Sequence, residues 1–66
     1  MLDVLYDGPF RYLHCKMTGE LIIVLHKHGS TFVEFEGEGE PVYRTLTEWK
    51  AIARRRMGDR INHTND

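Results

Sequence analysis

Four side chains in the first half of the sequence carry groups that could bind a metal ion. His26 and His28 are two residues apart, so they share one face of an extended strand, while His14 and Cys15 belong to the preceding apolar segment. Imidazole nitrogens and thiolates are the ligands that zinc prefers. The strand register predicted below puts His14 and His26 on opposite faces, and no further Cys or carboxylate completes a ligand set. We therefore expect solvated histidines and no metal or other cofactor.

The thiol of Cys15 could also act as a nucleophile with a histidine as its base. Adjacent residues of a strand point to opposite faces, so His14 is badly placed for that role. A chain of 66 residues also has little room for the sheltered cleft that catalysis uses. We expect Cys15 to be a small core residue, no enzymatic activity and no small-molecule substrate.

Four glutamates alternate with other residues in the sequence EFEGEGE. They are Glu34, Glu36, Glu38 and Glu40. On an extended chain they would project from one side at steps of roughly 6.6 Å, which resembles the phosphate spacing of a nucleic-acid strand and could fill the basic groove of a protein. Charges on an edge strand also prevent aggregation, and the two intervening glycines favour a flexible loop. We favour this second interpretation, with the run steering the approach of a partner.

Positive charge gathers towards the C-terminus. Residues 44–66 hold six bases and three acids, a net charge of +3, whereas residues 1–43 hold seven acids and three bases, a net charge of −4. A basic helix can contact phosphates. The candidates for such contacts are Arg44, Lys50, Arg54, Arg55 and Arg60. The sequence pI of about 6.4 and the scarcity of side chains that read base edges make nucleic acid the alternative to a protein partner.

Three apolar segments separated by turn signals predict an antiparallel β-meander. The segments span residues 10–17, 20–27 and 30–36, and the dipeptides Thr18-Gly19 and His28-Gly29 separate them. Asp7-Gly8 is a third turn signal, so residues 2–6 can add a fourth strand. We expect an α+β fold: a meander of three to four strands, followed by one C-terminal helix packed on one sheet face.

The helix has a clear start signal. Thr45 and Glu48 form a capping box, and Gly58 follows a basic last turn, which predicts a helix over residues 46–57. Its apolar side carries Leu46, Trp49, Ile52, Ala53 and Met57. Arg56 interrupts this side and needs a carboxylate or carbonyl partner, or a route to solvent. We predict one domain over residues 1–58 and a polar, flexible tail over residues 59–66.

Two-residue turns would fix which strand residues share a face. The face that receives the helix would carry Leu13, Cys15, Ile22, Val24, Val33 and Phe35. The opposite face would carry Phe10, Tyr12, Ile23, Leu25 and Phe32, with Glu34 and Glu36 at one end. One helix cannot cover both faces, so we expect this second face to bind a twin chain or a foreign partner. A slip of one residue would instead bring the glutamates under the arginines.

Size and composition limit what the chain can be. The longest apolar run is Leu21–Leu25, which is too short to span a membrane, and the start of the chain has no signal-peptide pattern. A single cysteine suits a reducing cytoplasm, and self-association is the stabiliser still open to so small a core. We expect a cytoplasmic, homodimeric regulator or inhibitor that binds a protein, of the kind that phages and mobile elements make. The alternative is DNA or RNA binding through the basic helix.

Overall fold

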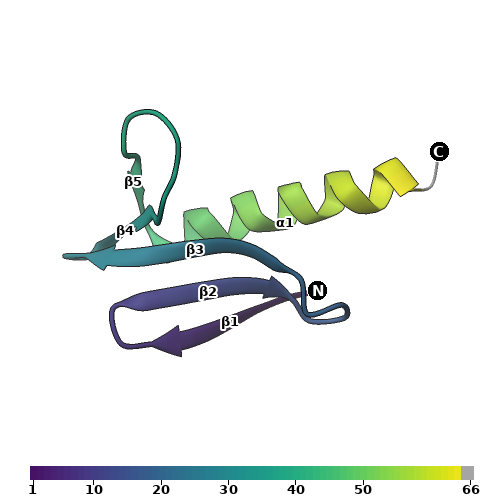
Figure 1. Ribbon diagram of the computed structural model, residues 1–66, viewed down its shortest axis with the longest axis horizontal. Helices are drawn as coiled ribbons and strands as arrows, with labels where there is room; N and C mark the ends of the chain where they lie inside the picture. Colours follow the sequence, from purple (N-terminus) through teal and green to yellow (C-terminus); the bar gives the residue numbers. More distant parts are fainter. Residues whose placement is uncertain (65–66) are drawn as a thin grey trace.

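In the part of the chain that the structure describes, five strands pair in chain order to form one antiparallel sheet, and a single helix lies along one side of it (Figure 1). The computed structural model describes the backbone of residues 1–64 and the side chains of residues 1–58. The elements are β1 (Leu2–Asp7), β2 (Phe10–Cys15), β3 (Leu21–His28), β4 (Thr31–Glu34), β5 (Tyr43–Arg44) and α1 (Leu46–Thr64). The predicted α+β meander followed by one helix is confirmed, with the fourth strand present and a short fifth added.

Two of the hairpins turn on a glycine. Gly8 and Pro9 join β1 to β2, and Gly29 and Ser30 join β3 to β4; the two glycines have φ angles of 60° and 64°. Glycine tolerates this left-handed conformation without a steric penalty, which is why it occupies the first turn position. The second turn lies one residue further along than the predicted His28-Gly29. That shift leaves the grouping of residues on each face of β3 and β4 unchanged.

The connection between β2 and β3 differs from the predicted two-residue turn. Residues 16–19 form a longer loop, closed by hydrogen bonds from the Cys15 N–H to the Glu20 carbonyl at 2.8 Å and from the Gly19 N–H to the Cys15 carbonyl at 2.7 Å. This loop alone moves the pairing by two residues, which would still have kept the predicted faces.

A β-bulge next to this loop reverses the faces. His14 lies opposite Leu21, but Leu13 lies opposite Ile23, so β3 has one extra residue, Ile22, at this point. A single inserted residue turns every later side chain of that strand to the other side of the sheet. The predicted register between β2 and β3 is therefore wrong by one residue.

The hydrophobic core shows the consequence. It consists of buried residues from the sheet and from α1: Leu13, Ile23, Leu25, Phe32, Trp49 and Ala53. Ile23, Leu25 and Phe32 were predicted on the partner face, and this prediction is wrong, because the bulge turns them towards the helix. The predicted apolar side of the helix is confirmed, since Leu46 and Ile52 also pack against this core.

The helix begins as predicted and continues further. The Thr45 N–H donates to Glu48 Oε1 at 2.9 Å, and the Glu48 N–H donates to Thr45 Oγ1 at 3.2 Å, which is the reciprocal geometry of a capping box. The helix passes through Gly58 to Thr64, so the end predicted at Met57 is wrong. The predicted flexible tail spans residues 59–66. The side chains of these residues, and the backbone of residues 65–66, lie outside the described part of the chain. Over the part of the chain that is described, no helix has the apolar length that a membrane span requires.

Candidate functional site

The face of the sheet turned away from α1 is covered by no other element of the described chain (Figure 1). We call it the open face. Strand pairing and ring contacts assign to it Leu5, Phe10, Tyr12, Val24, His26, Val33, Phe35 and Tyr43. Leu5 is 57% exposed and Phe35 is 48% exposed. A surface this rich in aromatic and aliphatic side chains is unusual on a soluble monomer.

The rings of the open face pack against one another around Phe10. Its ring centroid lies 5.1 Å from that of His26 and 5.6 Å from that of Phe35, both in edge-to-face geometry, and 6.2 Å from that of Tyr12. The Phe35 N–H donates to the Val24 carbonyl at 2.8 Å, which fixes this residue beside β3 although it follows the end of β4. The cluster is thus held in place by the sheet before any partner binds, so little side-chain entropy remains to be lost.

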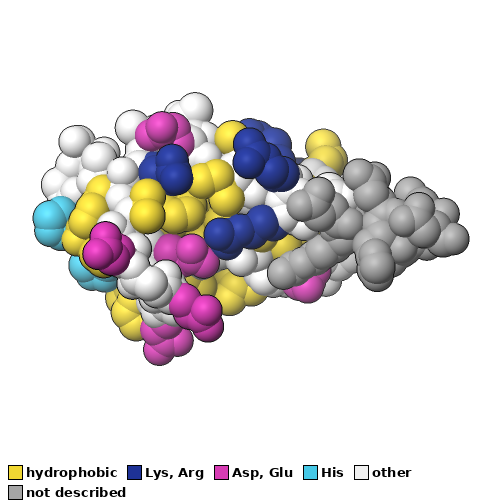
Figure 2. Space-filling view, turned by 90° about the horizontal axis from the view of Figure 1, so that it is seen from above, with side chains coloured by type: hydrophobic (Ala, Val, Ile, Leu, Met, Phe, Trp, Pro, Cys, Tyr) yellow, Lys and Arg dark blue, Asp and Glu magenta, His cyan; other side chains and the backbone are white. Residues whose placement is uncertain are grey.

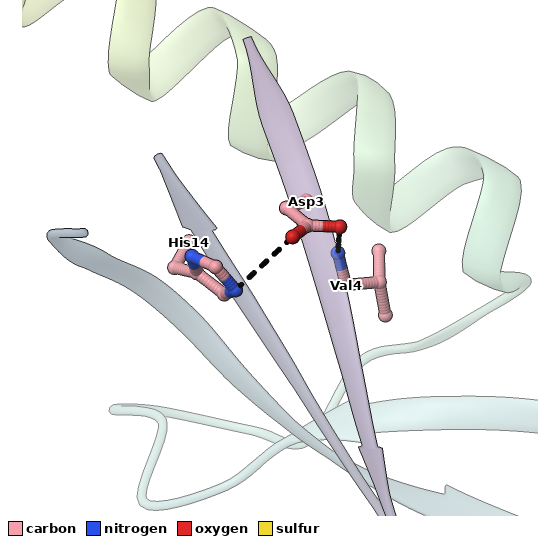
Figure 3. Close-up of polar contacts among 3 residues, drawn as sticks. All are labelled: Asp3, Val4 and His14. Carbon is pink, nitrogen blue, oxygen red and sulfur yellow. Dashed lines mark hydrogen bonds and ion pairs between the residues drawn. The ribbon is translucent and has the colours of Figure 1, made fainter. Parts of the chain in front are cut away.

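Polar side chains border the open face at β1, and Asp3 is among them. Asp3 lies between the neighbouring backbone and a histidine: its Oδ1 accepts the Val4 N–H at 2.9 Å, and its Oδ2 is 3.8 Å from His14 Nε2 (Figure 3). These side chains are exposed or half-buried, so the pair is a solvated contact at the margin of the apolar cluster.

The sequence identified part of this face. Phe10 and Tyr12 lie on it as predicted. Val24, Val33 and Phe35 were predicted under the helix and belong to the open face instead. Strand alternation grouped these three correctly with one another, but nothing in the sequence indicated the bulge that decides which side they occupy.

The glutamate run does not form the straight row that the alternation predicted. Glu34 ends β4, and its Oε2 accepts a hydrogen bond from Arg56 Nη1 at 3.2 Å. Glu36 has a positive φ of 60°, and it lies with Glu38 and Glu40 in the loop between β4 and β5. Of the alternatives predicted for Arg56, a carboxylate partner and a route to solvent are both present, since the side chain pairs with Glu34 and is 43% exposed. The pairing is the arrangement expected for a one-residue slip.

The loop at residues 36–42 and the first half of α1 enclose a shallow hollow of about 340 Å³. Its apolar lining includes Val42, Trp49 and Ile52, and its charged lining includes glutamates of the run together with Arg44 and Arg56. Figure 2 shows acidic and basic side chains beside an apolar patch on this side of the molecule. Because both signs of charge meet here, the hollow has no simple complementarity to one class of ligand.

Some basic side chains in and near the helix contact other residues of the protein, whereas others are exposed to solvent. The Arg44 guanidinium lies 5.9 Å from the centroid of the Trp49 ring, and Arg56 is paired with Glu34. Arg54 and Arg55 are exposed, and Lys50 is half-buried. The side chain of Arg60 lies outside the described residues.

Cys15 and the histidines lie on different faces of the sheet. Because of the bulge, His14 and His26 share the open face, so the prediction that these two lie on opposite faces is wrong. Cys15 is buried under the helix side of the sheet, as predicted. Hydrogen bonds from the Thr18 hydroxyl, and from the backbone of Thr18 and Met17, lower the pKa of its thiol below the usual value. Within residues 1–58, no three His, Cys, Asp or Glu side chains are grouped closely enough to hold a metal ion.

Comparisons with known proteins give no relative. No family model matches the chain, and the comparisons with curated proteins and with solved structures found no match. The fold and its surfaces define a small α+β protein with a sheet covered on one side by a helix.

Proposed function

We propose that the protein is a small non-enzymatic binding protein that acts as a homodimer and engages a protein partner, as a regulator or inhibitor does. The observation that supports this proposal is the open face, where aromatic and aliphatic side chains form one continuous cluster. The occupant of this face is a second copy of the chain. Two copies related by a two-fold axis present the same apolar cluster to each other, so one surface serves both.

The size of the open face sets the expected strength of this dimer. The five strands have six, six, eight, four and two residues, and at about 3.3 Å per residue and about 4.8 Å between strands they give a face on the order of 400 Å² per copy. Specific interfaces bury about 800 Å² of accessible surface per partner, and side-chain relief raises the accessible area above the planar one. We therefore expect an affinity at the weak end of specific complexes, with a Kd on the order of micromolar.

A pair of matched substitutions tests the assignment of the face. Phe35 belongs to the open face, whereas Met17 is also apolar and is more exposed, at 80% against 48%, but lies in the loop between β2 and β3. We expect Phe35→Ser to weaken self-association at least tenfold and Met17→Ser to leave it unchanged, both measured by sedimentation velocity over a concentration series. Equal effects of the two substitutions, or none, would refute the proposal.

Nucleic-acid binding through the helix is the second candidate, because Arg54 and Arg55 are both exposed on it. Fluorescence anisotropy with labelled duplex and single-stranded DNA, across a salt series, tests it. If this function holds, binding falls steeply with salt, and the double substitution Arg54→Ala/Arg55→Ala reduces the salt dependence by about two phosphate contacts. Binding without salt dependence, or unchanged in the double variant, excludes the helix as the site.

A further inference from the structure

The outer edge of β1 presents backbone hydrogen-bonding groups that the sheet does not use. The Lys16 N–H donates to the Met1 carbonyl at 2.8 Å, so the backbone of Met1, just before β1, faces β2. In an antiparallel ladder, every second residue of a strand has its backbone hydrogen-bonding groups turned towards the same neighbouring strand. The backbone N–H and C=O groups of Leu2, Val4 and Tyr6 therefore point away from β2, at the free edge of the sheet.

This edge carries few of the devices that usually protect an edge strand. Natural edges are blunted by charged side chains, especially lysine, and by proline, a bulge or short length; of these, β1 has the carboxylates of Asp3 and Asp7. Within the six residues of β1 there is no lysine and no proline, and its pairing with β2 is regular. The opposite edge differs, because β5 is only two residues long. An extended, accessible edge is thus a property of β1 in particular.

One of these outward N–H groups, that of Val4, forms a hydrogen bond with a side chain of β1 itself. The Val4 N–H donates to the carboxylate of Asp3 at 2.9 Å (Figure 3). This is the position that the carbonyl oxygen of an added strand would occupy. The Asp3 carboxylate stands in for that oxygen, and rotation of one exposed side chain would release the N–H.

The side chains of β1 define what an added strand would have to carry. On the helix side, Leu2 and Val4 are half-buried against the core and Tyr6 is 61% exposed, so apolar neighbours fit there. On the open-face side stand the carboxylates of Asp3 and Asp7. Residues directly opposite each other stabilise a sheet when their charges differ, and basic residues therefore fit opposite these two.

We propose that the edge of β1 binds an extended segment of the protein partner, in which apolar residues alternate with lysine or arginine. The segment adds a sixth strand to the sheet, with its main chain bonded to Leu2, Val4 and Tyr6. A second copy of the chain fits less well, because two-fold pairing about Val4 sets Leu5 against Asp3 and so brings no base to that carboxylate. This inference rests on the proposed protein-binding function, but it uses a surface other than the one assigned to self-association.

Tyr6 offers a matched pair of substitutions for the test. Tyr6→Pro removes an outward N–H that takes no part in the β1–β2 ladder, which an edge strand tolerates. Tyr6→Ala keeps that N–H and loses the same ring, including its contact with the Arg11 guanidinium, 4.5 Å from the ring centroid. Circular dichroism and thermal unfolding of both variants establish that they are folded.

The probe is a capped, fluorescent octapeptide of alternating valine and lysine, and its control replaces every lysine by glutamate. We expect the lysine peptide to bind the unmodified protein and Tyr6→Ala alike, to bind Tyr6→Pro at least tenfold more weakly, and to bind better than the glutamate peptide. No binding to the unmodified protein, or equal binding to the proline variant, would overturn the proposal. Self-association that Tyr6→Pro abolishes, with no peptide binding, would assign the edge to a second copy. Loss of the edge site leaves the Phe35→Ser comparison unaffected, because Tyr6 is not on the open face.

Discussion

At the scale of single residues, Trp49 connects the helix to the sheet. Its ring is buried in the core, and its indole N–H donates to the Phe32 carbonyl at 2.8 Å across the two layers. A buried donor and a buried acceptor satisfy each other here, so neither bears the penalty of an unpaired polar group. The orientation of α1 on the sheet depends on this contact as well as on apolar packing.

Replacing Trp49 by phenylalanine is therefore expected to destabilise the fold strongly. The Phe32 carbonyl loses the indole N–H as a donor and the smaller ring leaves unfilled volume, which together cost about 2–4 kcal/mol of the free energy of unfolding. Urea unfolding followed by circular dichroism measures this cost. Tyr43→Phe, at an exposed ring on the open face, is the control and should change the stability by less than about 0.5 kcal/mol.

The ion pair of Arg56 with Glu34 is expected to contribute much less. The side chains are 43% and 32% exposed, so water screens the attraction. A double-mutant cycle with Arg56→Ala and Glu34→Ala should give a coupling energy of about 0.2–1 kcal/mol. A coupling above about 2 kcal/mol would show that the pair is more sheltered than its exposure implies.

At the scale of elements, the start of α1 is fixed by its capping box. Hydrogen bonds from the backbone N–H and hydroxyl of Thr45 hold the pKa of the Glu48 carboxyl below its usual value. The unfolded chain then binds this proton at a higher pH than the folded protein does. The stabilisation by Glu48 is accordingly complete above the unfolded-state pKa, about 4.3, and is lost as the pH falls through the lower folded-state pKa.

This linkage predicts a pH-dependent difference between the protein and its Glu48→Gln variant. At pH 7 the glutamate protein should be the more stable of the two in thermal unfolding, and the difference should shrink as the pH drops below about 4.3. Thr45→Ala removes the other half of the box and should cost about 1 kcal/mol. A difference between the glutamate and glutamine proteins that is constant from pH 7 to pH 3 would contradict the assigned cause.

The helix start and the hairpins could be predicted from the sequence, because short local patterns mark them. The bulge in the pairing of β2 with β3 could not be predicted. The capping box at Thr45 and the glycine turn signals near each β-hairpin act within a few residues, so they indicated the helix start and the meander. The bulge at Ile22 arises from how β3 meets β2 and the core, and no local pattern marks it. Because one inserted residue reverses a strand, three of the five residues predicted for the open face lie in the core. The Gly58 stop signal also failed, because the helix continues through it.

At the scale of the whole molecule, the separation of acidic and basic segments in the sequence is partly neutralised by the fold. Glu34 pairs with Arg56, and Arg44 packs over Trp49, so part of each charged group is used internally. We propose two surfaces for association, the apolar open face for a second copy and the edge of β1 for an extended segment of a partner. They adjoin at β1, so a dimer would present two such edges to its partner.

The central claim is that two copies meet through the open face, and isotope-filtered NOE spectroscopy tests it most directly. A sample mixed from labelled and unlabelled chains, at a concentration well above the micromolar range, reports contacts between copies alone. We expect intermolecular NOEs from the ring protons of Phe10, Tyr12 and Phe35 to the methyl groups of Val24 and Val33. Intermolecular NOEs confined to α1 or to the β1 edge, or none in such a sample, would contradict the claim.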